Sequence, residues 1–200
     1  MPDAALPCPH PAMDKPLNPR RVSTPLENTP AKPWDPNAPI AAPLCLYQRD
    51  VPPDWVDYNG HMSESCYLLA FGDSSDAFFR YIGIDESYRD VRGLSLYTVE
   101  THIHNLQEVA EGESLSLSLQ VLDSDAKRIH IFHTMRHGRT GELLATGEQM
   151  LLHVDMREGR ASAMPVEIAQ RVQAIQQAHA ALPHPAQAGA SIGIRRKPVV

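Results

Sequence analysis

The second half of the chain consists largely of four long segments in which apolar and polar residues alternate. These segments span residues 95–108, 113–122, 127–137 and 142–155. In the second of them, Leu115, Leu117, Leu119 and Val121 alternate with serines and Gln120. Successive side chains of a strand point to opposite faces, so the pattern predicts strands with one buried and one polar face. Short turn-forming stretches join the segments, which favours antiparallel pairing.

One long helix is predicted before these strands, over residues 63–82. Its large apolar residues recur at helical spacing: Leu68, Phe71, Phe78 and Ile82. Gly83 is the predicted C-cap. Gly72 destabilises the helix interior, so we expect the backbone there to approach the sheet closely.

Two more elements complete the predicted domain. Residues 44–51 alternate as a strand that ends at Pro52-Pro53, and residues 166–182 form a last helix expected to pack at the sheet edge. Five strands and one long early helix predict an antiparallel α+β fold.

The segment between the first strand and the long helix carries Asp57, Asn59 and His61 within five residues. Asn59-Gly60 favours a turn, and the Ser63 hydroxyl can cap the helix that follows. Free backbone amides at a helix start attract developing negative charge. This order brings three polar side chains and a helix N-terminus to one point, which indicates an active site. The alternative is local structure, because Asp57 and Asn59 are also typical of an Asx-turn.

The same segment resembles the D-x-N-x-H-(V/M) sequence that opens the central helix of hotdog-fold acyl thioesterases. The match is carried by Asp57, Asn59, Gly60, His61 and Met62, and a helix containing Tyr67 follows. Residues 44–154 also keep the hotdog order of strand, long helix and four strands. The resemblance implies a hotdog fold, with a five-stranded antiparallel sheet wrapped around a long central helix.

Three further segments are similar to the betainyl-CoA thioesterases of carnitine catabolism. They are V-E-T-H-I at residues 99–103, D-x-K-R-x-H at 125–130, and a G-x-x-I-x-I-x-R-K-like tail at 189–197. One departure concerns acyl-carrier-protein thioesterases, which commonly carry two asparagines after H-V. Ser63 and Glu64 occupy those positions here, so an asparagine-based helix start cannot be carried over.

The resemblance implies hydrolysis of a short acyl-CoA thioester, first of all betainyl-CoA, to free acid and CoA without a further cofactor. Asp57 would act as general base on water or as a nucleophile that forms a mixed anhydride. Asn59 could position water or substrate, and His61 could donate to Asp57 or to the thioester. The oxyanion would be stabilised by backbone amides at the helix start: Gly60, Met62 and Ser63.

A betainyl group carries a trimethylammonium without N–H, so aromatic faces beside a carboxylate suit it best. The candidate aromatic residues are Trp55, Tyr58, Tyr67, Tyr97 and Phe71, of which Phe71 is better explained as core. The candidates for the phosphates of CoA are Lys127, Arg128, Arg139 and residues 195–197, although each could equally be a solvated charge. Because hotdog proteins place the site at a dimer seam, we expect a homodimer or a dimer of dimers.

Glu100 is a reserve acid/base candidate, because it shares a predicted strand face with His102 and His104 and could face the pocket. A salt bridge to a partner is the alternative. The chain's 10 histidines raise the question of a metal site, but they form no compact ligand motif, so no metal is expected.

Composition excludes several classes of function. A chain of 200 residues, 42% hydrophobic, suits one domain. A net charge of -6 without a basic stripe argues against nucleic-acid binding. No apolar run is long enough to span a membrane. Cys8, Cys45 and Cys66 have no metal-like spacing and cannot all pair, which suits a reducing compartment, so we expect a cytoplasmic location.

The first 41 residues differ from the rest in composition. Twelve of the 18 prolines fall within residues 1–43, in a segment with few aliphatic residues. We therefore predict an extended or disordered arm over residues 1–41, followed by the hotdog domain with its C-terminal helix and tail over 42–200. A strap that packs Trp34 onto a neighbouring subunit is the functional alternative.

Two other functions stay open. A hotdog enoyl-CoA hydratase carries a motif resembling D-x-N-P-x-H, whereas here His61 comes one residue earlier and the proline is missing. A non-catalytic acyl-CoA-binding module could use the same fold. Substitution of Asp57 distinguishes an enzyme, which loses turnover, from a binding module, which has none.

Overall fold

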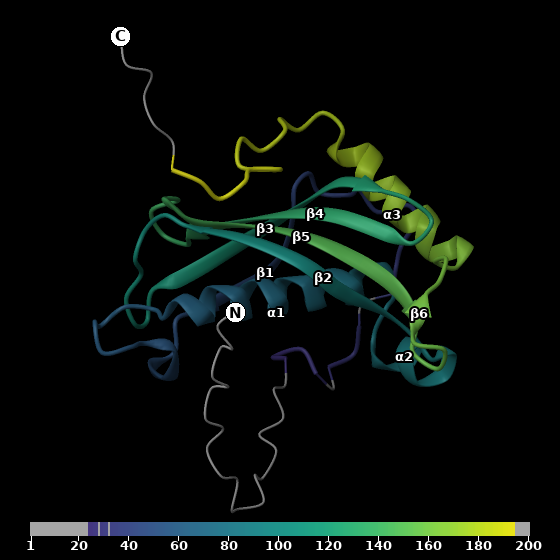
Figure 1. Cartoon of the computed structure of the whole chain (residues 1–200), viewed down its shortest axis with the longest axis horizontal. Helices are drawn as coiled ribbons and strands as arrows, with labels where there is room; N and C mark the ends of the chain where they lie inside the picture. The colour runs from purple at the N-terminus through teal and green to yellow at the C-terminus, as the bar shows by residue number, and fades with distance from the viewer. Residues whose placement is uncertain (1–23, 28, 32, 195–200) are drawn as a thin grey trace, which may run out of the picture.

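A curved antiparallel sheet wraps around one long helix, α1 (Glu64–Ile82), in the computed structural model (Figure 1). The structure describes residues 24–27, 29–31 and 33–194. The long strands are β1 (Leu44–Asp50), β2 (Leu94–Asn105), β3 (Ser114–Ser124), β4 (Arg128–His137) and β5 (Leu143–Asp155), in the spatial order β1-β3-β4-β5-β2. A short strand, β6 (Arg160–Ala161), pairs with β5. The predicted antiparallel α+β class is confirmed.

The two ends of α1 follow their sequence to different degrees. Gly83 adopts a left-handed φ of 91° and its N–H donates to the carbonyls of Phe79 and Arg80, so the predicted C-cap is confirmed. The expected Ser63 hydroxyl cap is wrong. Ser63 holds the N-cap position, but its hydroxyl makes no capping hydrogen bond to a backbone N–H of the helix and pairs instead with the Ser65 hydroxyl, Oγ to Oγ at 3.3 Å.

The close approach between helix and sheet occurs at a glycine of the sheet. A Cβ atom on Gly147 of β5 would lie 2.9 Å from Cδ2 of Phe71, so only glycine fits there without displacing this ring. Phe71 itself is completely buried and belongs to the core. The expected close contact at Gly72 is wrong, because this residue is exposed and no described atom would lie within 4 Å of a Cβ there.

Polar side chains are buried where α1 meets the sheet. Ser75 Oγ donates to Gln149 Oε1 at 2.7 Å and lies 3.1 Å from Nε2 of His133. Nearer the start of the helix, the Tyr47 hydroxyl donates to Asp73 Oδ2 at 2.8 Å. Such groups are costly to bury unless they are paired, so these contacts fix how α1 sits on the sheet.

The last helix, α3 (Val166–His179), lies beside β3 beyond the first residue of β1, Leu44. The β1–β3 pairing stops at Leu44 opposite Leu119. Two residues further along β3, the Val121 N–H donates to Nδ1 of His179 at 2.9 Å. The α3 side chain therefore accepts a strand hydrogen bond that β1 no longer accepts, and the predicted packing at the sheet edge is confirmed.

A short helix, α2 (Glu86–Arg92), lies before β2, in a stretch for which the sequence predicted no helix. The Asp85 carboxylate accepts from the Tyr88 N–H at 2.9 Å, and Gly93 ends the helix with a φ of 68°. A helix of seven residues is too short to show helical periodicity, so the capping residues were its main sequence sign.

Part of the predicted arm packs against its own domain. The Trp34 ring lies 5.3 Å from the Tyr81 ring, and the Arg171 guanidinium lies 5.7 Å from the Trp34 ring centre. Arg80 Nη1 donates to the Thr29 carbonyl at 3.1 Å. Trp34 thus contacts α1 and α3 of the same chain, while residues 1–23 lie outside the described part. The boundary at residue 41 stays a prediction.

Candidate active site

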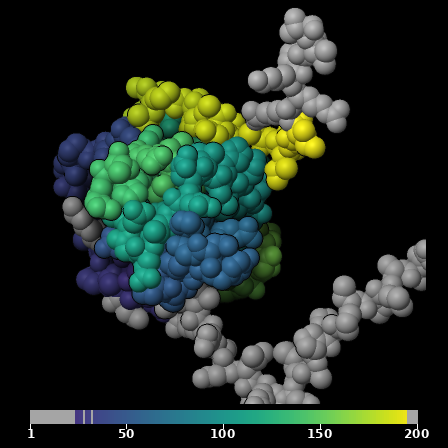
Figure 2. All heavy atoms as spheres, turned by 90° about the vertical axis from the view of Figure 1, so that its left-hand side faces the viewer, coloured from purple at the N-terminus to yellow at the C-terminus, as the bar shows by residue number. Residues whose placement is uncertain are grey.

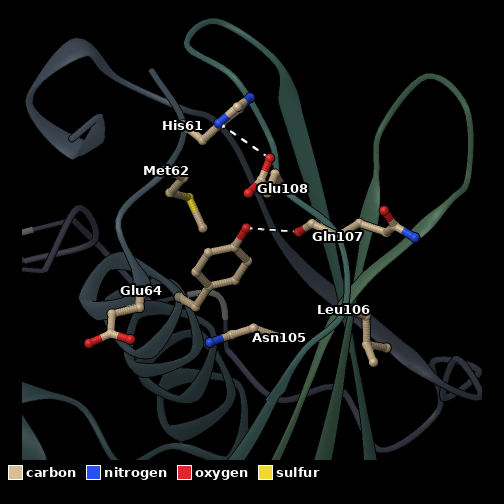
Figure 3. Close-up of a pocket in the computed structure, with 8 residues that line it drawn as sticks. His61, Met62, Glu64, Asn105, Leu106, Gln107 and Glu108 are labelled. Carbon is tan, nitrogen blue, oxygen red and sulfur yellow. Dashed lines mark hydrogen bonds and ion pairs between the residues drawn. The ribbon is translucent and has the colours of Figure 1, made fainter. Parts of the chain in front are cut away.

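A cavity of about 680 Å³ opens between the start of α1 and the end of β2 (Figure 3). Its lining residues are His61, Met62, Glu64, Tyr67, Asn105, Leu106, Gln107 and Glu108. From this end of the molecule, the blue segment before α1 and the teal connection between β2 and β3 lie side by side on the surface (Figure 2). The cavity therefore joins two segments that are far apart in the sequence.

The segment before α1 forms a tight turn closed by backbone hydrogen bonds. The Asp57 N–H donates to the His61 carbonyl at 3.0 Å, and the Gly60 N–H donates to the Asp57 carbonyl at 3.0 Å. Gly60 has a φ of 82°, which side chains disfavour, so the Asn-Gly turn predicted from the sequence is confirmed. Val56 and Met62 pair on either side of the turn, and His61 pairs with Ala110.

The turn places the three predicted catalytic residues differently. His61 lines the cavity, whereas Asp57 and Asn59 are not among the lining residues. The Asp57 Oδ1 atom accepts from the Asn59 N–H at 2.8 Å, which is the Asx-turn that the sequence offered as an alternative. The geometry of Asp57 thus includes a structural role, and a catalytic role for it stays a prediction.

Glu108 is the residue that the sequence did not reveal. Its Oε2 atom lies 3.4 Å from Nδ1 of His61, although its side chain is 78% exposed. The β2 ladder ends just before it, because the N–H groups of Leu106 and Gln107 both donate to the Leu144 carbonyl. This irregular end turns residues 106–108 toward the cavity. The pairing of His61 with Ala110 and the hydrogen bond from the Met62 N–H to the Val109 carbonyl bring Glu108 to the motif.

Tyr67 supplies the aromatic wall of the cavity. It is 4% exposed, and its hydroxyl donates to the Gln107 carbonyl at 3.0 Å. Burial raises the pKa of Tyr67, and the negative charge of Glu108 raises it further. The phenol therefore stays neutral with a fixed ring, within the electrostatic reach of the Glu108 carboxylate.

The other aromatic candidates lie away from this cavity. Trp55 is buried in the core, and the Arg49 guanidinium covers its ring at 4.3 Å from the centre. Tyr58 is 97% exposed at the tip of the turn. Tyr97 is half exposed on β2, eight residues from Asn105 and so about 26 Å along the strand. Within one subunit, the structure brings Tyr67 alone of the four to the cavity.

The backbone amides expected to form an oxyanion hole already have acceptors. The Met62 N–H donates to the Val109 carbonyl at 2.8 Å, and the Ser63 N–H donates to the Trp55 carbonyl at 2.9 Å. The Gly60 N–H closes the turn described above. In the part of the chain that the structure describes, the amides of Glu64 and Ser65, in the first turn of α1, donate to no other residue. These two are the better placed donors for an oxyanion.

Neither the reserve acid nor the basic candidates that the structure describes line the cavity of the same subunit. Glu100 is exposed on β2, five residues and about 16 Å from Asn105. Lys127 and Arg128 lie at the β3–β4 turn, level with the Tyr97 end of β2 and separated from it by β5. There Arg128 Nε donates to Asp125 Oδ2 at 2.8 Å, and Arg128 lowers the pKa of Asp125 to about 2.

Two candidate groups remain. Arg139, in the β4–β5 turn, lies 3.6 Å from a carboxylate oxygen of Glu113, and residues 195–197 fall outside the described part.

The histidine rings of His102 and His104 lie 4.6 Å apart, centre to centre. Among the described residues, no three His, Cys, Asp or Glu side chains gather in a way that could hold a metal ion. None of the described helices is long and apolar enough to cross a membrane.

Comparison with known proteins gives the family. Residues 51–172 match the model of the Thioesterase-like superfamily. The chain is 50% identical over 155 residues to a Rhizobium protein named L-carnitine dehydrogenase/betainyl-CoA thioesterase, covering 77% of this chain but only 31% of that protein. It is 43% identical over 151 residues to the betainyl-CoA thioesterase of Pseudomonas aeruginosa, covering 76% of this chain and 95% of that one.

The fold comparison agrees with the sequence comparison. A Staphylococcus aureus protein solved in complex with CoA superposes with a TM-score of 0.73 at 24% identity, covering 79% of this chain and 100% of the other. At this identity, the likeness concerns the fold alone. The chain belongs to the Thioesterase-like superfamily and has the hotdog fold that its sequence predicts.

Proposed function

We propose that the protein hydrolyses betainyl-CoA to betaine and CoA, with CoA entering only as part of the substrate. The observation that carries this proposal is the cavity at the end of the turn, where an imidazole, a carboxylate and an aromatic ring converge. The relatives named as betainyl-CoA thioesterases support the choice of substrate. One of them matches this chain over 95% of its own length.

Water must be activated for thioester hydrolysis, and the charge that develops on the carbonyl oxygen must be stabilised. We assign the first task to Asp57, as general base or nucleophile, because its Oδ2 atom makes no hydrogen bond with another described residue. His61 on the cavity wall donates to the thioester or to Asp57, and Asn59 positions water or substrate. The first-turn amides of Glu64 and Ser65 face the oxyanion.

In this proposal, a second subunit completes the active site. β2 forms one edge of the sheet, with Tyr97 and Val99 50% and 54% exposed. An exposed strand edge is a template for pairing with another chain. Antiparallel pairing of β2 with its copy about a two-fold axis brings the Tyr97 end of one strand beside the Asn105 end of the other. Tyr97, Lys127 and Arg128 of the partner then approach the cavity, where the basic pair can meet the phosphates of CoA.

We place the reaction in the cytoplasm, which the free thiols of Cys45 and Cys66 support. The decisive experiment is a thiol-release assay with short, charged and long acyl-CoAs. Betainyl-CoA should give the highest kcat/KM. Release of free CoA from no member of the panel would contradict the thioesterase assignment, whereas release from neutral acyl-CoAs alone would contradict only the choice of substrate.

A further inference from the structure

Negative charge dominates the wall of the cavity at the motif. Among the described residues that line it, Glu64 and Glu108 carry carboxylates and none is a lysine or an arginine. Figure 3 shows the Glu108 side chain pointing toward His61, whereas the Glu64 side chain points away from both. Glu108 is therefore the carboxylate that faces the His61 imidazole.

The surroundings of Glu108 suit a cation that cannot donate a hydrogen bond. Tyr67 uses its hydroxyl on the Gln107 carbonyl, so the phenol offers its ring rather than its O–H to a ligand. Trp55 cannot take this part, because the Arg49 guanidinium already lies over its ring and would repel a second cation. A quaternary ammonium is attracted by ring faces and carboxylates without requiring a directed hydrogen bond.

We propose that Glu108 determines the specificity of the enzyme for a positively charged acyl group, by pairing with its quaternary ammonium against the Tyr67 ring; this rests on the proposed thioesterase function. In the free protein a carboxylate oxygen of Glu108 lies 3.4 Å from Nδ1 of His61, at the wall of the cavity. A bound acyl group displaces water from the exposed side of Glu108 and so strengthens the attraction between the two charges. Glu108 thus acts on the choice of acyl group, and the residues of the turn act on the thioester bond.

The test compares betainyl-CoA with 3,3-dimethylbutanoyl-CoA, in which carbon replaces the charged nitrogen. Glu108→Gln keeps the size of the side chain and removes its charge. We expect kcat/KM for betainyl-CoA to fall about tenfold, while the value for the neutral substrate changes less than about twofold. Glu111→Gln removes the same charge from the same connection, outside the cavity lining, and should leave both values unchanged.

A charge reversal gives the test a gain of function. Glu108→Lys should abolish the preference for betainyl-CoA and raise kcat/KM for succinyl-CoA, whose free carboxylate would meet the new ammonium. Equal losses for betainyl-CoA and its neutral isostere in Glu108→Gln would show that Glu108 acts through His61, and would overturn the proposal. A kcat/KM for betainyl-CoA that stays at the wild-type value in Glu108→Gln would overturn it as well. If the wild-type enzyme cleaves both substrates equally well, the positive charge is not recognised, but the thioesterase function stands. If it cleaves neither, the proposed function itself is refuted.

Discussion

Ser75 on α1 lies 3.1 Å from Nε2 of His133 on β4, inside the layer where the helix meets the sheet. His133 is completely buried, and its Nδ1 atom has no hydrogen-bond partner among the described residues. Since the Ser75 hydroxyl donates to Gln149, the imidazole donates from Nε2 and keeps Nδ1 unprotonated. Protonation of Nδ1 would place an uncompensated charge in the core.

Stability should consequently depend on pH through His133. Burial lowers the pKa of His133 from 6.5 to about 4. Between these values the unfolded chain binds a proton that the folded chain does not, so folding becomes weaker as the pH falls from 6.5 to 4. His133 should account for a loss of about 3 kcal/mol in the free energy of unfolding. Burial also lowers the pKa of His153 and of His179, which act in the same direction.

Denaturant titrations at pH 7 and pH 5 measure this effect. His133→Gln cannot titrate, so its free energy of unfolding should fall less between the two pH values than that of the wild type. An identical pH dependence in the variant would exclude His133 as a contributor.

Asp57→Asn should lower turnover of betainyl-CoA by about 10²-fold or more, the scale of a lost general base. The fold should survive, because an asparagine Oδ1 can accept from the Asn59 N–H as the carboxylate does. Asp54→Asn is the matched control, because Asp54 is an exposed residue of the short 3-10 helix Pro53–Trp55 just before the turn. Turnover of Asp57→Asn within about threefold of wild type would rule out a catalytic role.

Substitutions of two aromatic residues by leucine should have different effects, one on substrate selectivity and the other on stability. Tyr67→Leu removes the ring at the cavity, so the preference for betainyl-CoA over its neutral isostere should fall several-fold, since a cation held by a ring gains about 0.5–2 kcal/mol. Trp55→Leu should lower the free energy of unfolding and leave this preference unchanged, because the ring already holds Arg49. A loss of selectivity in Trp55→Leu equal to that in Tyr67→Leu would contradict this assignment.

The protein should be a dimer at micromolar concentration, paired through β2. Val99→Asp puts a charge on that edge and should shift the mass measured by light scattering toward the monomer. Val166→Asp, an equally simple change of an exposed valine on α3, should not. A wild-type monomer with full activity would remove the second subunit from the site.

Removal of residues 1–23 should leave thioester cleavage intact, because their proline-rich composition indicates no packed core. Trp34→Ala should instead destabilise the protein by about 1–2 kcal/mol, through loss of the contact with Tyr81. Thermal unfolding and the thiol-release assay measure the two effects separately. A folded deletion variant without activity would show that the arm contributes to the cavity.

The long elements were predictable because their periodicity extends over many residues. Apolar and polar residues alternate without interruption from Leu115 to Val121. These residues form part of β3, which pairs with β1 and β4 as the pattern requires. The site was predictable only in part. The sequence identified His61 and Tyr67, which belong to the motif and its helix. It could not identify Glu108, or the acceptors of the Met62 and Ser63 amides, because both depend on pairing between distant segments.

The pairing of His61 with Ala110 brings two segments that are far apart in the sequence to one wall of the cavity. The segment before α1 holds the side chains assigned to bond cleavage, and the connection after β2 holds the carboxylate assigned to acyl choice. A thioesterase built this way could acquire a new substrate through replacements in that connection alone, without altering the turn that precedes its central helix. The side chains that cleave the bond and the carboxylate that selects the acyl group would then evolve independently, each in its own short stretch of the gene.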